Sequence, residues 1–302
     1  MSAPHALHQR YPFLPDLVLL LVAMVWGSSY GLAKQALLFY PVLGLLALRF
    51  GLTFILLLPA QRALADAATR RATVLASLPL GVGLLGIFLC ETYGVAHTSA
   101  ANAAFLISLC LVLTPFAEWL LLGQKPETDA LLAAAVSLFG AWLLSGAAHL
   151  QLNGGDLLML LAAVLRALVT SLTRRLTHAR PVATLALTGL QSLVICLGCL
   201  LLAAAQGGLP TLPSQPAFWG NVLYLVLFCT LFAFFAMNYA LRHSSATRVA
   251  LLTGSEPVFG AAFAVLWLGE SLPPASWLGG GLMVVASLWA VRPRRTLQLS
   301  RA

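Results

Sequence analysis

The chain has 302 residues, of which 60% are hydrophobic and only 9% are charged, and its mean hydropathy is +0.92. A soluble domain carries about 25% charged residues, so this composition excludes a water-soluble globular protein. The net charge of +8 and the pI near 9.7 would suit a nucleic-acid-binding domain, but here the basic residues fall between apolar stretches. That placement is typical of membrane proteins, and no nucleic-acid partner is expected.

Apolar stretches long enough to cross a bilayer as helices follow one another along the whole chain. Pro, Gly and charged residues punctuate nearly every junction between them. Lipid admits only helices or closed barrels, and no alternating strands of barrel type occur, so we predict an all-α integral membrane protein. Its ten predicted transmembrane helices span 15–35, 41–61, 73–93, 99–121, 129–147, 155–174, 182–205, 217–241, 246–268 and 274–292.

The basic residues also predict the orientation of the chain. With the N-terminus in the cytoplasm, fourteen of the 17 Lys and Arg residues lie on the cytoplasmic side, and only Lys34 lies on the other. Arg49 and Arg166 fall inside spans. By the positive-inside rule, both termini are predicted to be cytoplasmic. Arg far outnumbers Lys, and both Ala and Leu are abundant, which indicates a GC-rich bacterial genome. We therefore expect the protein in the inner (plasma) membrane of a bacterial cell.

An internal repeat divides the sequence. "HTSAANAAFL" (97–106) aligns with "HSSATRVALL" (243–252) at an offset of 146, and "DLVLLLVAMVWG" (16–27) aligns with "DLLMLLAAVLRA" (156–167) at an offset of 140. Each half holds five spans, an odd number, so the second copy enters the membrane from the opposite face. We predict two inverted five-helix repeats, 1–148 and 149–302. Such repeats are typical of secondary transporters with a midplane substrate site and alternating access.

Four segments carry a family resemblance: "WGSSY" (26–30), "TSAANAAFL" (98–106), "EPVFGAAFAVLWLGE" (256–270) and "GGGLMVVASLW" (279–289). They resemble the EamA-type members of the drug/metabolite transporter (DMT) superfamily. The resemblance implies ten helices, export of small metabolites with amino acids the commonest class, and a central cavity lined mainly by spans 1, 3, 4, 6, 8 and 9.

Two positions depart from this family pattern. Arg166 stands where the family usually has an aromatic residue, in the slot that matches Trp26. Pro115 lies four positions later than the repeat offset from Pro257 predicts, which leaves the location of a kink in span 4 open.

Ionisable residues inside spans indicate function, because each is costly in lipid unless it faces a cavity or a partner. Arg166 and Glu256 each lie about ten residues into a span, near the bilayer midplane. In one interpretation Arg166 binds a substrate carboxylate while Glu256 balances its charge or takes up a proton; in the other they form a structural ion pair. Arg49, in a span expected to be peripheral, is predicted to pair structurally or to reach toward water. Glu91 is predicted to pair with Arg49 or to line the outer mouth, and Glu118 to reach the cytoplasmic interface.

Trp26 and Tyr30 are four residues apart and share one face of span 1. Trp26 lies too deep for an interfacial aromatic belt, so these rings are predicted to hold apolar or cationic parts of a ligand in the cavity; core packing is the alternative. Asn102, Phe105 and Asn238 are further candidates for the cavity wall, although buried amides more often join helices. The predicted substrate-binding set is Trp26, Tyr30, Asn102, Phe105, Arg166, Asn238 and Glu256.

Enzyme and cofactor motifs are missing from the sequence. "GVGLLG" (81–86) matches a dinucleotide-binding pattern, but it lies inside a span without the required strand. The five cysteines all fall in apolar spans, where packing is the expected role, and no metal or cofactor is predicted.

The predicted function is therefore export of amino acids or related small metabolites, with a small-molecule substrate and the lipid bilayer as partners. One alternative is a transporter of the same superfamily for a nucleotide sugar, a nucleoside or a cationic drug. A membrane-embedded enzyme is the alternative from another class. A monomer and a weak homodimer are both left open.

Overall fold

The computed structural model describes residues 14–98, 100–144, 153–268 and 273–291, and every regular element within those ranges is a helix. The α-helices are α2 Leu14–Leu37, α3 Val42–Leu56, α4 Ala67–His97, α5 Ala100–Ser108, α6 Cys110–Leu122, α7 Thr128–Leu144, α8 Gly154–Thr177, α9 Thr184–Ala205, α10 Pro216–Tyr224, α11 Ala233–His243, α12 Ala246–Thr253, α13 Glu256–Leu268 and α14 Pro274–Val291. Two further elements are the 3-10 helix η1 Leu58–Ala65 and the π-helix η2 Leu225–Phe232. The predicted all-α class is confirmed for this part of the chain.

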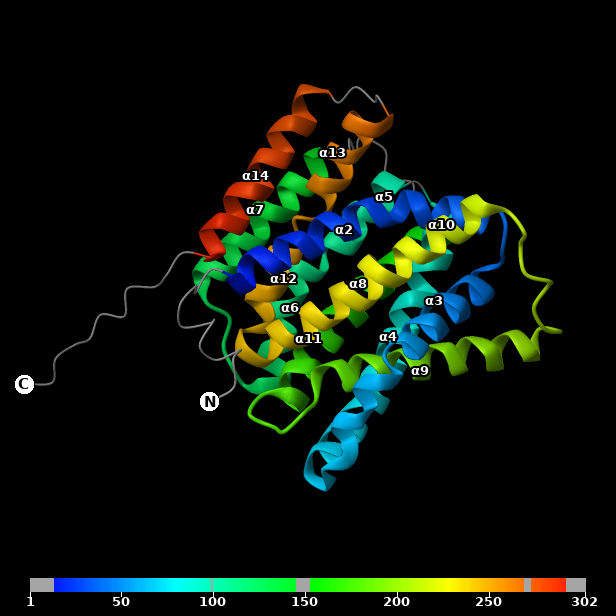
Figure 1. Cartoon of the computed structure of the whole chain (residues 1–302). Coiled ribbons are helices and arrows are strands. Elements are labelled where there is room, and N and C mark those ends of the chain that lie inside the picture. Colours follow the sequence, from blue (N-terminus) through cyan, green and yellow to red (C-terminus); the bar gives the residue numbers. More distant parts are fainter. Residues whose placement is uncertain (1–13, 99, 145–152, 269–272, 292–302) are drawn as a thin grey trace, which may run out of the picture.

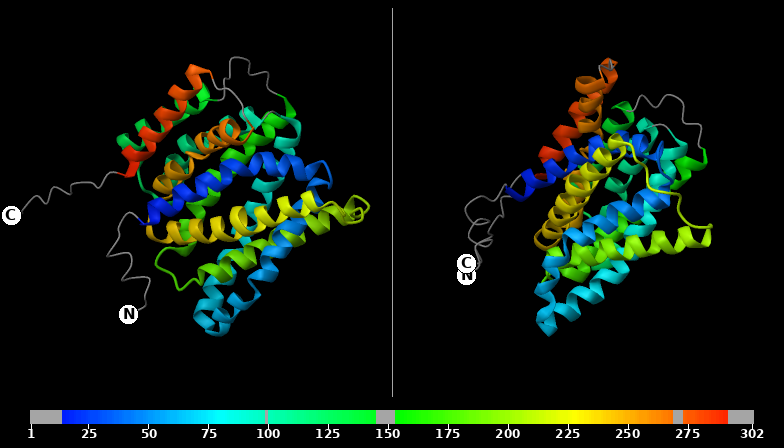
Figure 2. Two further views of the ribbon diagram at one scale, coloured as in Figure 1. Left: turned by 45° about the horizontal axis from the view of Figure 1, so that its top comes forward. Right: turned by 45° about the vertical axis from the view of Figure 1, so that its right-hand side comes forward.

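The helices form one bundle around α2 and α8 (Figure 1). The pair α7 and α14 lies along one edge, while α3, α4 and α9 pack together at the opposite edge; Figure 2 shows the same arrangement from two other directions. The elements that surround the centre therefore come from both halves of the sequence.

Six helical stretches are long and apolar enough to cross a membrane: 16–37, 67–97, 105–122, 154–177, 184–205 and 216–243. A seventh is added if α3 and η1 are taken as one span, which is bent by 54°. The helix of the predicted span 41–61 thus ends at Leu56. Pro59 explains the early end, because proline lacks an N–H donor and disfavours helical geometry in the residue before it.

The helix bounds follow the sequence repeat. α2 covers 14–37 and α8 covers 154–177, so both bounds differ by 140. α5 and α6 begin at 100 and 110, while α12 and α13 begin at 246 and 256, so both starts differ by 146. The break in span 4 therefore falls at Leu109, in register with the break in span 9. Pro115, whose offset from Pro257 left the location of this break open, lies inside α6.

Glycines let the central helices approach closely. A Cβ atom on Gly27 of α2 would lie 2.6 Å from the carbonyl oxygen of Glu256 and from the backbone nitrogen of Gly260. The backbones of α2 and α13 are thus in direct contact, as small residues permit in lipid. In the same way, a Cβ on Gly140 of α7 would lie 2.6 Å from the Gly279 oxygen of α14.

Glu118 joins three helices at the end of the bundle where α12 begins. Its carboxylate accepts hydrogen bonds from the Ala246 and Thr247 backbone N–H groups, both at 3.0 Å, and from the Thr247 hydroxyl at 2.6 Å. Arg174 Nε of α8 lies 3.6 Å from it. The side chain is buried, yet it lines a second cavity together with Lys125 and Asp129; whether Glu118 reaches the cytoplasmic interface stays a prediction. Its negative charge satisfies the free N–H groups at the positive end of α12.

Candidate functional site

A cavity of about 980 Å³, counted to its open mouth, lies between the helices of the two halves. Its walls come mainly from α2, α4, α8 and α11. The lining residues are Trp26, Ser29, Tyr30, Ala33, Arg49, Leu84, Ile87, Phe88, Glu91, Thr92, Val95, Arg166, Val169, Thr170, Thr173, Gln191, Phe234, Met237, Asn238, Leu241 and Glu256.

Arg166 and Glu256 meet in this cavity. Arg166 Nη2 donates to Glu256 Oε2 at 3.1 Å, and the Arg166 guanidinium carbon lies 4.7 Å from the centre of the Trp26 ring. The ion pair that the sequence left open is therefore present. An arginine on an indole face gains a cation–π contact as well, so both neighbours fix its position.

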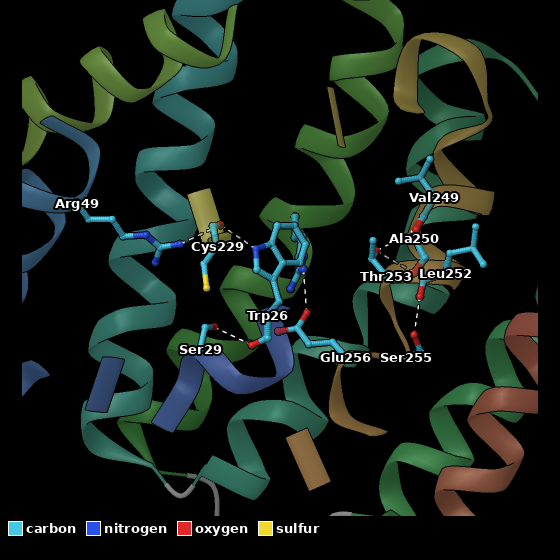
Figure 3. A network of polar contacts seen from close by, with 11 residues as sticks. Trp26, Ser29, Arg49, Cys229, Val249, Ala250, Leu252, Thr253, Ser255 and Glu256 are labelled. Atoms are coloured by element: carbon cyan, nitrogen blue, oxygen red, sulfur yellow. Dashed lines mark hydrogen bonds and ion pairs between the residues drawn. The ribbon is translucent and has the colours of Figure 1, made fainter. Parts of the chain in front are cut away.

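The break between α12 and α13 positions Glu256. The Ser255 hydroxyl donates to the Leu252 carbonyl at 2.7 Å, and the Thr253 hydroxyl donates to the Val249 carbonyl at 2.9 Å (Figure 3). The first bond caps a carbonyl in the last turn of α12, and the second holds the Thr253 side chain against the helix. Glu256 is then the first residue of α13, where the positive end of the helix favours a carboxylate.

The π-helix η2 supplies a second anchoring point. The Cys229 carbonyl accepts hydrogen bonds from Trp26 Nε1 at 2.9 Å and from Arg49 Nη2 at 3.2 Å, and Figure 3 shows the two side chains reaching it from opposite sides. Arg49 Nε also donates to the Thr230 hydroxyl at 2.6 Å. The expectation that Arg49 is peripheral to the cavity is wrong: it is buried and belongs to the cavity wall.

Tyr30 and Glu91 face the same cavity from α2 and α4. Tyr30 is 92% buried, and its hydroxyl has no hydrogen-bond partner within the described part of the chain. It lies close enough to Glu91 and Glu256 to interact electrostatically with both. Glu91 is half-buried and forms no ion pair within 4.0 Å among the described residues.

Three other predicted site residues differ in their placement. Asn238 lines the cavity, and its amide donates to Thr188 at 3.0 Å and to Gln191 at 2.9 Å, so it also joins two helices. Phe105 is not among the lining residues; it packs in the hydrophobic core with Tyr30. The Asn102 side chain lies outside the described residues. Among the residues whose side chains the structure describes, no lining residue comes from α5 or α6, which departs from the expectation that span 4 forms a wall.

The cavity wall repeats itself at the sequence offsets of the two halves. Arg166 takes the place of Trp26 at the offset of 140, and Asn238 that of Thr92 at the offset of 146. Arg49 and Gln191 correspond as well, because α3 and α9 begin at 42 and 184. The corresponding pairs in the wall are Trp26/Arg166, Ser29/Val169, Tyr30/Thr170, Ala33/Thr173, Arg49/Gln191, Phe88/Phe234, Glu91/Met237, Thr92/Asn238 and Val95/Leu241.

Some of these corresponding residues touch. Arg166 lies on the Trp26 ring, and the Phe88 and Phe234 ring centres are 5.7 Å apart. Contacts between equivalent positions are expected where two repeats meet across a two-fold pseudo-axis, which is where such folds build a substrate site.

A described chain that is helical throughout its regular elements, with several apolar spans and a central cavity that holds charged side chains, defines the class of helical membrane transport proteins. The chain belongs to the EamA-like transporter family, whose model matches residues 13–146 and again 153–292. It is therefore a multi-pass membrane transporter, and the predicted family is confirmed.

Relatives in other organisms agree with this assignment. An uncharacterized transporter of Archaeoglobus fulgidus is 25% identical over 276 residues, covering 90% of this chain and 83% of the relative. A probable terminal-alkyne amino-acid exporter of Streptantibioticus cattleyicolor is 26% identical over 282 residues, covering 92% and 93%. These relatives are named as transporters and not as enzymes. A solved crystal structure, 18% identical, covers 92% of this chain and 96% of its own with a TM-score of 0.75, and so shares the fold.

Proposed function

We propose that this transporter exports amino acids or related small metabolites from the cytoplasm across the inner (plasma) membrane. Ten spans would form two inverted repeats, 1–148 and 149–302, with both termini cytoplasmic. The matching helix bounds and the two separate family matches support this organisation. Rocking of one repeat against the other would expose the cavity to each side in turn.

The charge balance of the cavity carries the proposal. Its wall holds two arginines, Arg49 and Arg166, and two glutamates, Glu91 and Glu256, so the formal charges cancel. Each uncompensated charge is costly at membrane depth. A zwitterion such as an amino acid adds no net charge to this site. A nucleotide sugar would bring two uncompensated negative charges and a cationic drug an uncompensated positive one, which disfavours both.

The substrate would lie against Trp26, Tyr30 and the Arg166–Glu256 pair, with Asn238 shaping the wall. Arg166 uses one N–H for Glu256, and a guanidinium has five, so donors remain for a ligand. The relative named as a probable terminal-alkyne amino-acid exporter supports an amino acid as the substrate class.

Counterflow into proteoliposomes tests the proposal. The purified protein should exchange at least one labelled proteinogenic L-amino acid, and Arg166→Ala should reduce that exchange at least tenfold. Arg62→Ala is the matched control, because Arg62 is exposed on η1 outside the cavity. Exchange of nucleotide sugars or organic cations but of no amino acid would overturn the substrate class. Unchanged amino-acid exchange by Arg166→Ala would overturn the role of Arg166.

A further inference from the structure

Every charged residue of the cavity corresponds to an uncharged residue in the other half of the chain. At the offsets that relate the halves, Arg49 corresponds to Gln191, Glu91 to Met237, Arg166 to Trp26 and Glu256 to Cys110. The first three of these uncharged partners line the same cavity. The framework common to the two halves therefore forms with neutral side chains at the equivalent positions of the other half.

Two of the four charges already neutralise each other. Arg166 and Glu256 form an ion pair at 3.1 Å. Arg49 and Glu91 are different, because neither has an ion-pair partner within 4.0 Å in the part of the chain that the structure describes. Glu91 interacts electrostatically with Arg166 first, then with Glu256 and Arg49, and both Arg49 and Glu91 belong to the cavity wall. A gap between unpaired opposite charges is complementary to a ligand that carries both.

Arg49 keeps the donors that an anion would need. Its printed hydrogen bonds use Nε and Nη2, for Thr230 and Cys229, and both acceptors are uncharged. The Phe50 and Phe88 rings lie 5.3 and 5.1 Å from its guanidinium carbon. These contacts orient the 93% buried side chain, but they do not cancel its charge. Its remaining N–H groups, including those on Nη1, are left for a carboxylate.

Tyr30 lies beside the proposed ammonium site. Its buried hydroxyl lies near Glu91 and Glu256 and interacts with both carboxylates. A ligand ammonium on Glu91 would bring a further polar neighbour within reach of this hydroxyl.

We propose that Arg49 and Glu91 are the charged anchors of a zwitterionic substrate, with its carboxylate on Arg49 and its ammonium on Glu91. This inference rests on the proposed amino-acid transport and deepens it. It assigns the substrate class as amino acids in which both the amino and the carboxyl group are free. It also adds two binding residues, Arg49 and Glu91, beside the Arg166–Glu256 pair.

The test combines changes in the ligand with changes in the protein. In counterflow with the purified full-length protein, the best labelled amino acid is competed with its carboxamide, which lacks the carboxylate, and with its deaminated acid, which lacks the ammonium. Each analogue should compete about 10- to 100-fold more weakly than the amino acid, because it loses a charge-assisted contact. Equal competition by either analogue would overturn the proposal.

The variants copy the residues that the other half of the chain uses. Arg49→Gln should weaken competition by the amino acid about 10- to 100-fold and leave that by the carboxamide unchanged. Glu91→Met should weaken competition by the amino acid similarly and leave that by the deaminated acid unchanged. If the role of these residues were merely structural, competition by all three ligands would weaken together, and that result would overturn the proposal. Arg62→Gln on exposed η1 is the matched control.

Folding and function failures can be told apart. Because Arg49 also binds the Cys229 carbonyl, size-exclusion elution and thermal unfolding are measured for each variant, and Arg49→Lys keeps the charge. If Arg49→Gln does not fold, Arg49→Lys and Glu91→Met decide the question: unchanged analogue selectivity in Glu91→Met would overturn the proposal. If the unmodified protein exchanges no amino acid at all, the proposed function fails; if it does and the variants match Arg62→Gln, only the anchors fail.

Discussion

The Arg166–Glu256 pair is the contact on which the centre of the site depends. Its two charges are largely removed from water, with side-chain exposures of 16% and 5%. Removing one partner of such a pair leaves the other buried and uncompensated, at a cost of about 3 kcal/mol or more. Glu256→Gln should therefore lower the free energy of unfolding by about 3 kcal/mol, measured by denaturation in detergent micelles.

A double-mutant cycle separates pairing from packing in this prediction. Arg166→Met combined with Glu256→Gln should destabilise less than the sum of the two single changes, by more than about 1 kcal/mol, because no charge is then left unpaired. Strict additivity would mean that the two side chains contribute independently. In that case the ion pair would not contribute to stability as a pair.

Most of the predicted site residues lie where the sequence suggested, for a physical reason. Arg166 and Glu256 were found from depth alone, since a charge at midplane needs a cavity or a partner. Depth could not show which way Arg49 points, and the family resemblance placed its span at the periphery. The alignment of α3 with α9, which relates Arg49 to Gln191, is the signal that could have corrected this. The prediction that Phe105 lines the cavity was wrong, because an apolar ring suits a core as well as a cavity wall.

Among the helices, the crossing of α2 and α13 leaves little room for change. A methyl group on Gly27 would meet the α13 backbone at 2.6 Å, and backbone cannot move aside as a side chain can. Gly27→Ala should push the two helices apart, lower the thermal unfolding temperature and reduce amino-acid exchange. Gly31→Ala is the matched control one turn further along α2, because a Cβ there meets nothing within 4 Å. Equal behaviour of the two variants would show that the close crossing is not required.

The elements themselves were predictable to different degrees. The breaks after α5 and α12 lie at equivalent positions of the repeat, but the sequence predicted unbroken spans there, because the offset of Pro115 from Pro257 left the location of a kink open. The π-helix η2 was not predictable either, because its sequence "LVLFCTLF" is uniformly apolar and favours a regular helix equally well. Its geometry depends on tertiary contacts instead, namely those that Trp26 and Arg49 make with the Cys229 carbonyl. Interactions between residues so far apart in sequence leave no local signal.

At the scale of the whole molecule, two aspartates at equivalent positions of the repeat each connect the start of one helix to a second helix. Asp16 at the start of α2 binds Arg248 of α12, with Nη2 to Oδ2 at 2.7 Å and Nε to Oδ1 at 3.1 Å. Asp156 at the start of α8 accepts a hydrogen bond from the Thr98 hydroxyl at 2.5 Å. The first contact is a two-point ion pair, whereas the second joins one charged and one neutral group. In the proposed alternating-access mechanism, each of these two contacts would break in turn.

The two contacts predict opposite effects for the same Asp→Asn substitution at Asp16 and at Asp156. Asp16→Asn removes the charge that holds Arg248, so it should shift the protein toward the state open to the cytoplasm. Asp156→Asn weakens the contact with Thr98 and should shift the protein toward the outward-open state. The readout is maleimide labelling of Thr173→Cys and Val95→Cys, two cavity-wall positions near the C-terminal ends of α8 and α4, with the five native cysteines replaced. In sealed, oriented vesicles, Asp16→Asn should raise labelling of Thr173→Cys from the cytoplasmic side several-fold, and Asp156→Asn that of Val95→Cys from the outside. Labelling that rises from the reverse sides would invert the proposed orientation, and unchanged labelling would show that the aspartates do not control access.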